Sequence, residues 1–97
     1  MGLDLVWSGR ENRNRILVSL GDQSQLVLRP AFDALEQSTG VFVDPYGTTR
    51  IGPDHAKLLA DAIKVRDLHR HSTEVERFLS LLGAAVVDNK WLIAEGD

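Results

Sequence analysis

Cysteine is absent from the 97-residue chain, and its absence excludes disulfides, thiolate catalysis and cysteine-ligated zinc. Long hydrophobic runs are absent as well, because no apolar stretch approaches the roughly 18 residues that a membrane span needs. The opening residues, Met1 to Asp4, contain an early acid and lack the basic region of a secretory signal. We therefore expect a cytoplasmic protein with no membrane association.

The chain also lacks an excess of basic residues, since 11 Lys and Arg stand against 14 Asp and Glu, for a net charge of −3. Proteins that bind nucleic acid depend on phosphate contacts and normally carry a positive excess, so we expect no nucleic-acid partner. The sequence contains no nucleophile elbow, phosphate-binding loop, dinucleotide fingerprint or zinc-protease motif. These absences predict a non-catalytic protein with no cofactor.

The remaining composition is that of an ordinary globular domain, with 43% hydrophobic and 26% charged residues. No repeat or linker divides the chain, so residues 1–97 are expected to form one domain. Apolar patterning and turn residues predict strands at 3–7, 15–20, 41–43, 48–51, 84–87 and 90–94. Helices interspersed among these strands without a regular period indicate an α+β fold, a small antiparallel sheet with two to three helices packed on one face.

The first helix is predicted to end at Thr39 before Gly40. Because proline is tolerated only in a first turn, Pro30 places the start of this helix at residues 25–29, with Ser24 or a neighbour as its cap. The second helix is predicted to begin at Gly52-Pro53-Asp54, with an apolar stripe at Leu58, Leu59, Ala62, Ile63 and Val65.

The third helix is predicted from a capping box over Thr73–Glu76 and from the helical spacing of Val75, Phe78, Leu79 and Leu82 before Gly83. A terminal hairpin is expected after it, with its turn at Asp88-Asn89, and Gly96-Asp97 are expected to fray.

Two polar clusters are weak candidates for ligand sites. His69 and His71, with Asp67, are able to share a metal ion only if their segment is extended, and we expect no metal site. The first loop contains Arg10, Arg13 and Arg15, and arginine is able to bind a phosphate or carboxylate through two hydrogen bonds. An exposed polar loop is the simpler interpretation.

The strongest turn signal is Asp44-Pro45-Tyr46-Gly47, which has the residue preferences of a type I turn. Tyr46 at its apex offers a rigid, exposed aromatic ring, a type enriched among binding hot spots. We expect Tyr46 to contact a protein partner, with the helix face carrying Asp54 and Asp61 as a polar rim. Four further acids, Asp22, Asp33, Glu36 and Asp44, form either an acidic patch beside the first helix or an ordinary solvated face.

The run from Thr39 to Ile51, together with the helix Pro53–Leu59, resembles small bacterial immunity proteins of polymorphic-toxin systems, over about a third of the chain. The resemblance implies a cytoplasmic protein that neutralises one toxin domain by occluding it, and it transfers no individual functional residue. A mild negative charge suits this role, since many such toxins are basic nucleases. The alternatives are an antitoxin or phage-derived inhibitor of another complex, and a small ligand-binding protein or enzyme that uses the arginine loop.

Overall fold

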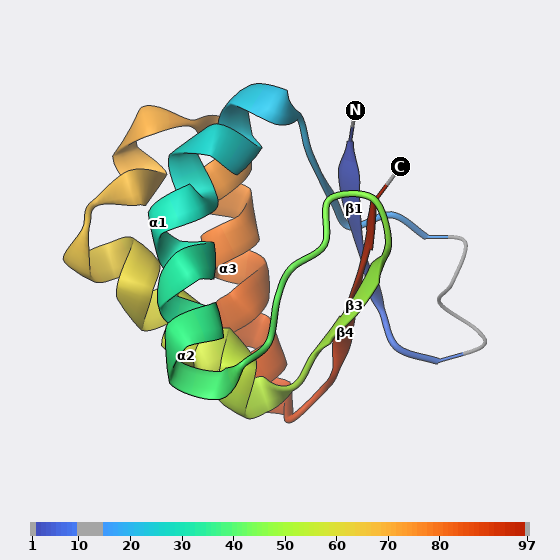
Figure 1. Cartoon of the computed structure of the whole chain (residues 1–97). Coiled ribbons are helices and arrows are strands. Elements are labelled where there is room, and N and C mark those ends of the chain that lie inside the picture. The colour runs from blue at the N-terminus through green and yellow to red at the C-terminus, as the bar shows by residue number, and fades with distance from the viewer. Residues whose placement is uncertain (1, 10–14, 97) are drawn as a thin grey trace.

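The computed structural model describes residues 2–9 and 15–96, and this part of the chain has an α+β architecture of two layers (Figure 1). One layer is an antiparallel sheet of β1 (Leu3–Trp7), β2 (Val18–Leu20), β3 (Thr48–Ile51) and β4 (Leu92–Gly96). The other layer contains α1 (Asp22–Thr39), α2 (Pro53–Val65) and α3 (Thr73–Asp88), with the short 3-10 helix η1 (Leu68–His71) between the last two. The helices lie on one face of the sheet, as the sequence predicted.

The two central strands of the sheet come from opposite ends of the chain. The strand order is β2-β1-β4-β3, and every neighbouring pair is antiparallel. Leu3 pairs with Gly96 and Trp7 with Leu92, whereas β3 pairs with β4 through Thr48 and Glu95. The predicted hairpin of β1 and β2 is confirmed, although β2 is shorter than residues 15–20.

The core lies between the two layers, because alternate strand residues point at the helices. The sheet contributes mainly Leu3, Leu5, Leu20, Ile51 and Leu92, all essentially inaccessible to solvent. The helices contribute Leu28, Leu35, Leu59, Ile63, Val75, Phe78 and Leu82. In α2 the predicted apolar stripe is only partly correct, because Leu58 and Val65 are exposed while Ala56 and Ala60 are buried. In α3 Leu79 is half-buried against the core.

Helix α1 begins earlier than predicted, so Pro30 lies inside it rather than in its first turn. Pro30 has no N–H to donate to the carbonyl of Leu26 one turn earlier. Pro30 and Leu26 are both exposed, so that carbonyl lies on the water side of the helix and the cost is small. Gly21 takes the N-cap position without a side-chain bond, and Ser24 is a buried residue of the first turn, not the cap. Gly40 ends the helix in the left-handed conformation, as predicted.

Residues 41–43 are not a strand, and the predicted tight hairpin with residues 48–51 is wrong. The strand β3 pairs with β4 instead, and the segment 41–44 follows an irregular path from α1 to the turn. Only Val43 of this segment is fully buried.

The predicted terminal hairpin is also wrong. Residues 84–87 continue α3, and Ala85 is fully buried on its inner face. The helix ends where Asn89 adopts the left-handed conformation, with φ 53°, a conformation that asparagine tolerates better than most residues. At its other end the N-cap is Ser72, whose Oγ accepts from the Val75 N–H at 3.4 Å. The predicted capping box over Thr73–Glu76 is therefore wrong, because the cap lies one residue earlier and Val75 in the third helical position has no side-chain acceptor to return the bond.

The first turns of α1 and α3 are joined by a hydrogen-bond cluster around Glu74. Its Oε1 accepts from the Gly21 N–H at 2.9 Å and from the Ser24 hydroxyl at 2.7 Å, and Ser24 also contacts the Ser72 hydroxyl at 3.1 Å. These donors favour the charged carboxylate, with the Gly21 backbone N–H contributing most, and they lower the pKa of Glu74 from its usual value.

We expect Glu74→Gln to lower the free energy of unfolding at pH 7 by about 1.5–3 kcal/mol, the range for hydrogen bonds to a charged group. Because the pKa of Glu74 is depressed by folding, its contribution is present above the unfolded pKa and is lost as the pH falls through the folded pKa. Urea denaturation from pH 7 down to pH 3 should therefore show the two proteins converging in acid. Glu76→Gln removes an exposed charge from the same helical turn and serves as the control; an equal loss in both variants would contradict the role of Glu74.

Candidate functional site

The turn at residues 44–47 is confirmed and is held by its own first residue. The Asp44 carboxylate accepts from the Tyr46 N–H at 2.9 Å, and the Asp44 carbonyl accepts from the Gly47 N–H at 3.4 Å. Asp and Asn favour turns by this kind of local bond. The apex is therefore fixed independently of the Tyr46 side chain.

Two further contacts fasten the turn to the sheet. The buried Thr49 hydroxyl accepts from the Asp44 N–H at 3.0 Å and donates to the Phe42 carbonyl at 3.4 Å. On the opposite side, the Gly96 N–H donates to the Gly47 carbonyl at 2.7 Å. A Cβ on Gly96 would overlap the carbonyl of Pro45, so the turn rests directly on the backbone of β4. Gly96 is thus the last residue of β4, and the prediction that it frays is wrong. Asp97 lies outside the described residues.

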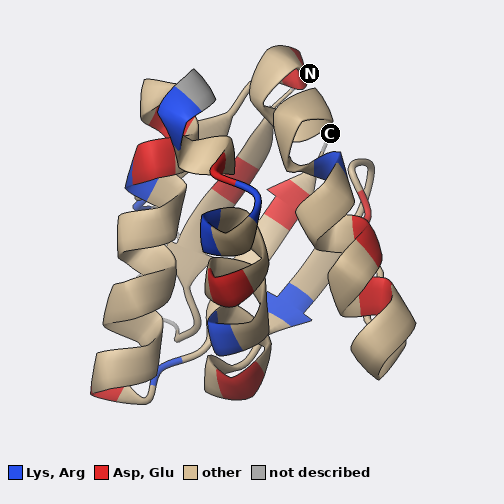
Figure 2. Ribbon diagram, turned by 90° about the vertical axis from the view of Figure 1, so that its left-hand side faces the viewer, with Lys and Arg blue, Asp and Glu red and all other residues tan. Residues whose placement is uncertain are grey.

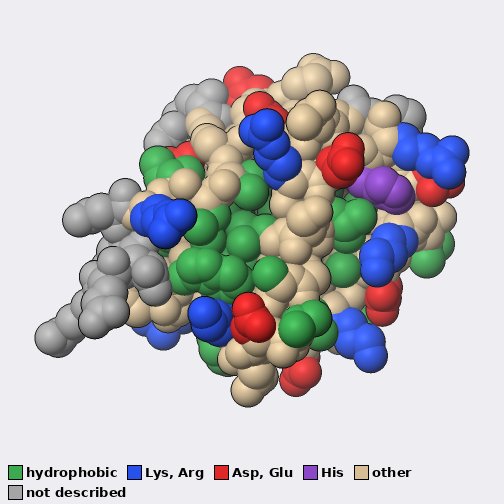
Figure 3. All heavy atoms as spheres, turned by 180° about the vertical axis from the view of Figure 1, so that it is seen from behind, with side chains coloured by type: hydrophobic (Ala, Val, Ile, Leu, Met, Phe, Trp, Pro, Cys, Tyr) green, Lys and Arg blue, Asp and Glu red, His purple; other side chains and the backbone are tan. Residues whose placement is uncertain are grey.

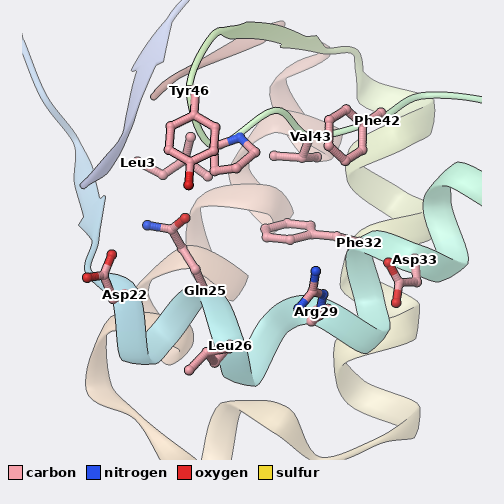
Figure 4. A pocket seen from close by; sticks show the side chains of 11 residues that line it. Leu3, Asp22, Gln25, Leu26, Arg29, Phe32, Asp33, Phe42, Val43 and Tyr46 are labelled. Carbon is pink, nitrogen blue, oxygen red and sulfur yellow. The ribbon is translucent and has the colours of Figure 1, made fainter. Parts of the chain in front are cut away.

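A pocket of about 420 Å³ opens between this turn and α1 (Figure 4). The segment 42–46 forms one wall, and the side chains of α1 from Asp22 to Asp33 form the other. The lining residues are Leu3, Asp22, Gln25, Leu26, Arg29, Phe32, Asp33, Phe42, Val43, Pro45 and Tyr46. Tyr46 and Gln25 face each other across the opening.

Three large apolar side chains around the pocket are exposed to solvent. Tyr46 is 71% accessible, Leu26 61% and Phe42 60%. Phe32, which also lines the pocket, is half-buried and lies edge-to-face against the core residue Phe78, with ring centroids 6.2 Å apart. Exposed apolar side chains gathered around a hollow are typical of interaction sites, whereas scattered ones need no explanation.

The polar groups of the rim come from α1. Gln25 is anchored by its Nε2, which donates to the Leu20 carbonyl at 2.9 Å. Arg29 and Asp33 are exposed, and within residues 2–9 and 15–96 neither side chain has a hydrogen-bond or ion-pair partner. Figure 2 shows that α1 carries mostly acidic charges, whereas charges of both signs alternate along the outward face of α2.

The structure brings Tyr46 together with α1, not with the acidic residues of α2. Asp54 and Asp61 are exposed on α2, and neither lines the pocket. Their role in binding stays a prediction. Of the four acids considered as a patch, Asp22 and Asp33 line the pocket and Asp44 shapes the adjoining turn, while Glu36 is exposed further along α1.

Of the arginine loop, Arg10 and Arg13 lie outside the described residues, and Arg15 is exposed. Among the described residues no group of three His, Asp or Glu side chains is placed to hold a metal ion. His55 has a structural role, since its Nδ1 accepts from the Gly52 N–H at 3.3 Å and its ring meets Trp91 edge-to-face. The side chain of His71 lies outside the described part.

Sequence reasoning missed Phe32, Phe42, Gln25 and Arg29 as pocket residues. Phe32 fitted the apolar stripe of a helix, and Phe42 fitted a strand. A usable signal was present in the polar residues at 22, 25, 29 and 33, whose spacing of three and four places them on one side of a helix. That row became visible only once α1 was known to begin at Asp22.

The opposite side of the molecule carries apolar side chains near its centre, surrounded by charges of both signs (Figure 3). Elsewhere on the described surface, Ile16, Val65 and Val87 are exposed hydrophobic residues that do not line the pocket. They provide reference positions for testing where a partner binds.

Comparison of the chain with protein-family models, with curated proteins and with solved structures finds no match. No helix in the described part of the chain is both long and apolar enough to cross a bilayer.

Proposed function

We propose that this protein is a non-catalytic protein-binding module whose contact surface is the pocket between α1 and the 44–47 turn. The observation that carries the proposal is the grouping of exposed Tyr46, Phe42 and Leu26 around a hollow whose walls are already fixed. A fixed surface loses little conformational freedom when a partner binds, and this favours affinity.

The biological role that we propose is immunity: the protein occludes a cognate bacterial toxin in the cytoplasm. The support is the resemblance of the segment 39–59 to immunity proteins, together with the position of this segment in the fold. The segment contains the outer wall of the pocket, including Phe42 and Tyr46. The alternative role, an antitoxin or a phage-derived inhibitor of another protein complex, would use the same surface.

The pocket also supports a second candidate, the binding of a small molecule. Its volume of about 420 Å³ lies within the range of roughly 300–1,000 Å³ found for ligand pockets. Arg29 would supply a cation for an anionic ligand. The exposure of three large apolar side chains around the opening favours a macromolecular partner over this alternative.

We expect Tyr46→Ala to weaken the complex with the partner by about 2 kcal/mol or more, the threshold of a hot spot, or roughly 30-fold in Kd. The ring is 71% exposed, so the free energy of unfolding should change by less than about 0.5 kcal/mol. The partner is isolated by parallel affinity purification with wild-type and Tyr46→Ala baits from the bacterium that carries the gene. Calorimetry with the purified partner then gives the two Kd values.

The control is Val87→Ala, which truncates an exposed apolar side chain outside the pocket. Unchanged affinity for Tyr46→Ala, with a loss for Val87→Ala, would place the interface elsewhere and overturn the proposal. The immunity role is tested separately, by whether co-expression restores growth to cells that produce the partner.

A further inference from the structure

The shape and charge of the pocket also indicate what the partner presents to it. Resting on the proposed function, we propose that the pocket receives one aromatic side chain of the partner, from a segment with lysine or arginine beside that side chain.

The first step is the size of the pocket. A volume of about 420 Å³ is near the lower end of the range for ligand sites, so there is room for one large side chain and not for a folded element. The walls that would touch it are chiefly apolar and aromatic, with Phe32 on the α1 wall and Phe42 and Tyr46 on the wall opposite. Aromatic rings favour edge-to-face or offset contacts with other rings, so an aromatic insert fits these walls best.

The second step is the rigidity of the walls. Phe32 is held by its edge-to-face contact with the buried ring of Phe78. The opposite wall is held by Thr49, which binds the backbone at both Phe42 and Asp44. The insert therefore meets a preformed slot, and the slot does not have to be assembled on binding.

The third step is the charge around the opening. Among the described residues that line the pocket, Asp22 and Asp33 are the acids and Arg29 is the one base, and Glu36 follows Asp33 on the same side of α1. Asp44 adds a carboxylate in the turn opposite. The surroundings are therefore negative in sum, in agreement with the net charge of −3, and complementary to a basic segment.

The test titrates isotope-labelled protein with three capped pentapeptides and follows the backbone amides by NMR. Each peptide has a central phenylalanine, flanked by two lysines, two glutamines or two glutamates. We expect the lysine peptide to shift amides of residues 22–33 and 42–46, and to bind about two- to tenfold more tightly than the glutamine peptide at low salt. The glutamate peptide should bind most weakly.

Three variants test whether the charges at the rim of the pocket cause the preference for the lysine peptide. Asp33→Asn should reduce the preference for the lysine peptide about twofold or more, whereas Arg29→Gln should increase it. Asp88→Asn removes an exposed acid at the end of α3, away from the pocket lining, and should leave the preference unchanged.

If the glutamate peptide binds as tightly as the lysine peptide or more tightly, with the same amides shifted, the proposal that the partner's segment is basic is wrong. The proposed function is not affected by that result. If none of the three peptides shifts the pocket amides, the proposal that the pocket receives an aromatic side chain is wrong. The proposed function would still be judged by Tyr46→Ala with the full partner.

Discussion

Replacing Phe78 by alanine is expected to lower the free energy of unfolding by about 3–5 kcal/mol, the range for truncating a buried phenylalanine. The side chain is fully buried in α3 at the centre of the core. Its removal leaves a cavity that the surrounding helices fill only in part. Chemical denaturation of the wild type and the variant measures the difference.

The chain contains a matched control for this substitution. Phe42→Ala removes the same side chain from a position that is 60% exposed, and it should cost less than about 1 kcal/mol of stability. Phe78→Ala should also loosen Phe32, the ring that it contacts in the pocket wall. Similar losses in the two variants would mean that the core is not centred on Phe78.

The second large effect is expected from Gly96→Ala, which should destabilise the protein by about 1–3 kcal/mol and abolish the ordered 44–47 turn. A methyl group at this position would overlap the carbonyl of Pro45 and lie 2.8 Å from the Tyr46 nitrogen. Relief requires the backbone of the turn or of β4 to move, and such overpacking typically costs this amount. Because the turn carries Tyr46, binding of the partner should fail as well.

Denaturation and the amide NMR signals of Tyr46 and Gly47 test this expectation. Gly83→Ala is the control, because an added Cβ there meets nothing within 4 Å and the residue lies inside α3. That variant should gain about 0.5–1 kcal/mol, the usual benefit of alanine over glycine in a helix. If the Gly96→Ala protein has wild-type stability and unshifted amide signals for Tyr46 and Gly47, the close approach of the turn to Gly96 is unimportant.

The sequence was sufficient where local signals and the fold agree. The turn at Asp44–Gly47 was predicted because its preferences come from side chains within four residues. The start of α2 at Pro53 was predicted for the same reason, and the alternation in residues 3–7 identified β1. These features supported the α+β fold class, although two of the predicted strands, at residues 41–43 and 84–87, are not strands.

The failures occur where distant contacts override local preference. The β-branched pair Val86-Val87 favours a strand, yet the burial of Ala85 against the core keeps the segment helical. Asn89 was the available signal, since asparagine commonly ends helices in the left-handed conformation. Pro30 led to the wrong start for α1, because an internal proline costs little when the carbonyl that loses its N–H donor, here that of Leu26, faces water.

The candidate site was predicted only in part. Tyr46 followed from the turn, but its neighbours on α1 come from residues more than a dozen positions earlier in the chain. Local patterning contains no information about that approach. It depends on the bond between Gly47 and Gly96, which sets the turn on β4, and on the contact of Phe32 with Phe78.

The pairing of β1 with β4 also sets a limit on how the protein folds. Leu3 and Gly96 are neighbours in the sheet, so its two central strands cannot meet until almost the whole described chain is available. Closing so long a loop costs conformational entropy before the contacts between β1 and β4 can form and offset it. This cost slows folding relative to helical proteins of the same size. During synthesis the three helices leave the ribosome before the strand that completes the sheet beneath them. The domain therefore acquires its native structure only after residues 92–96 have emerged, and until then its apolar helix faces lack the complete sheet that covers them in the native fold.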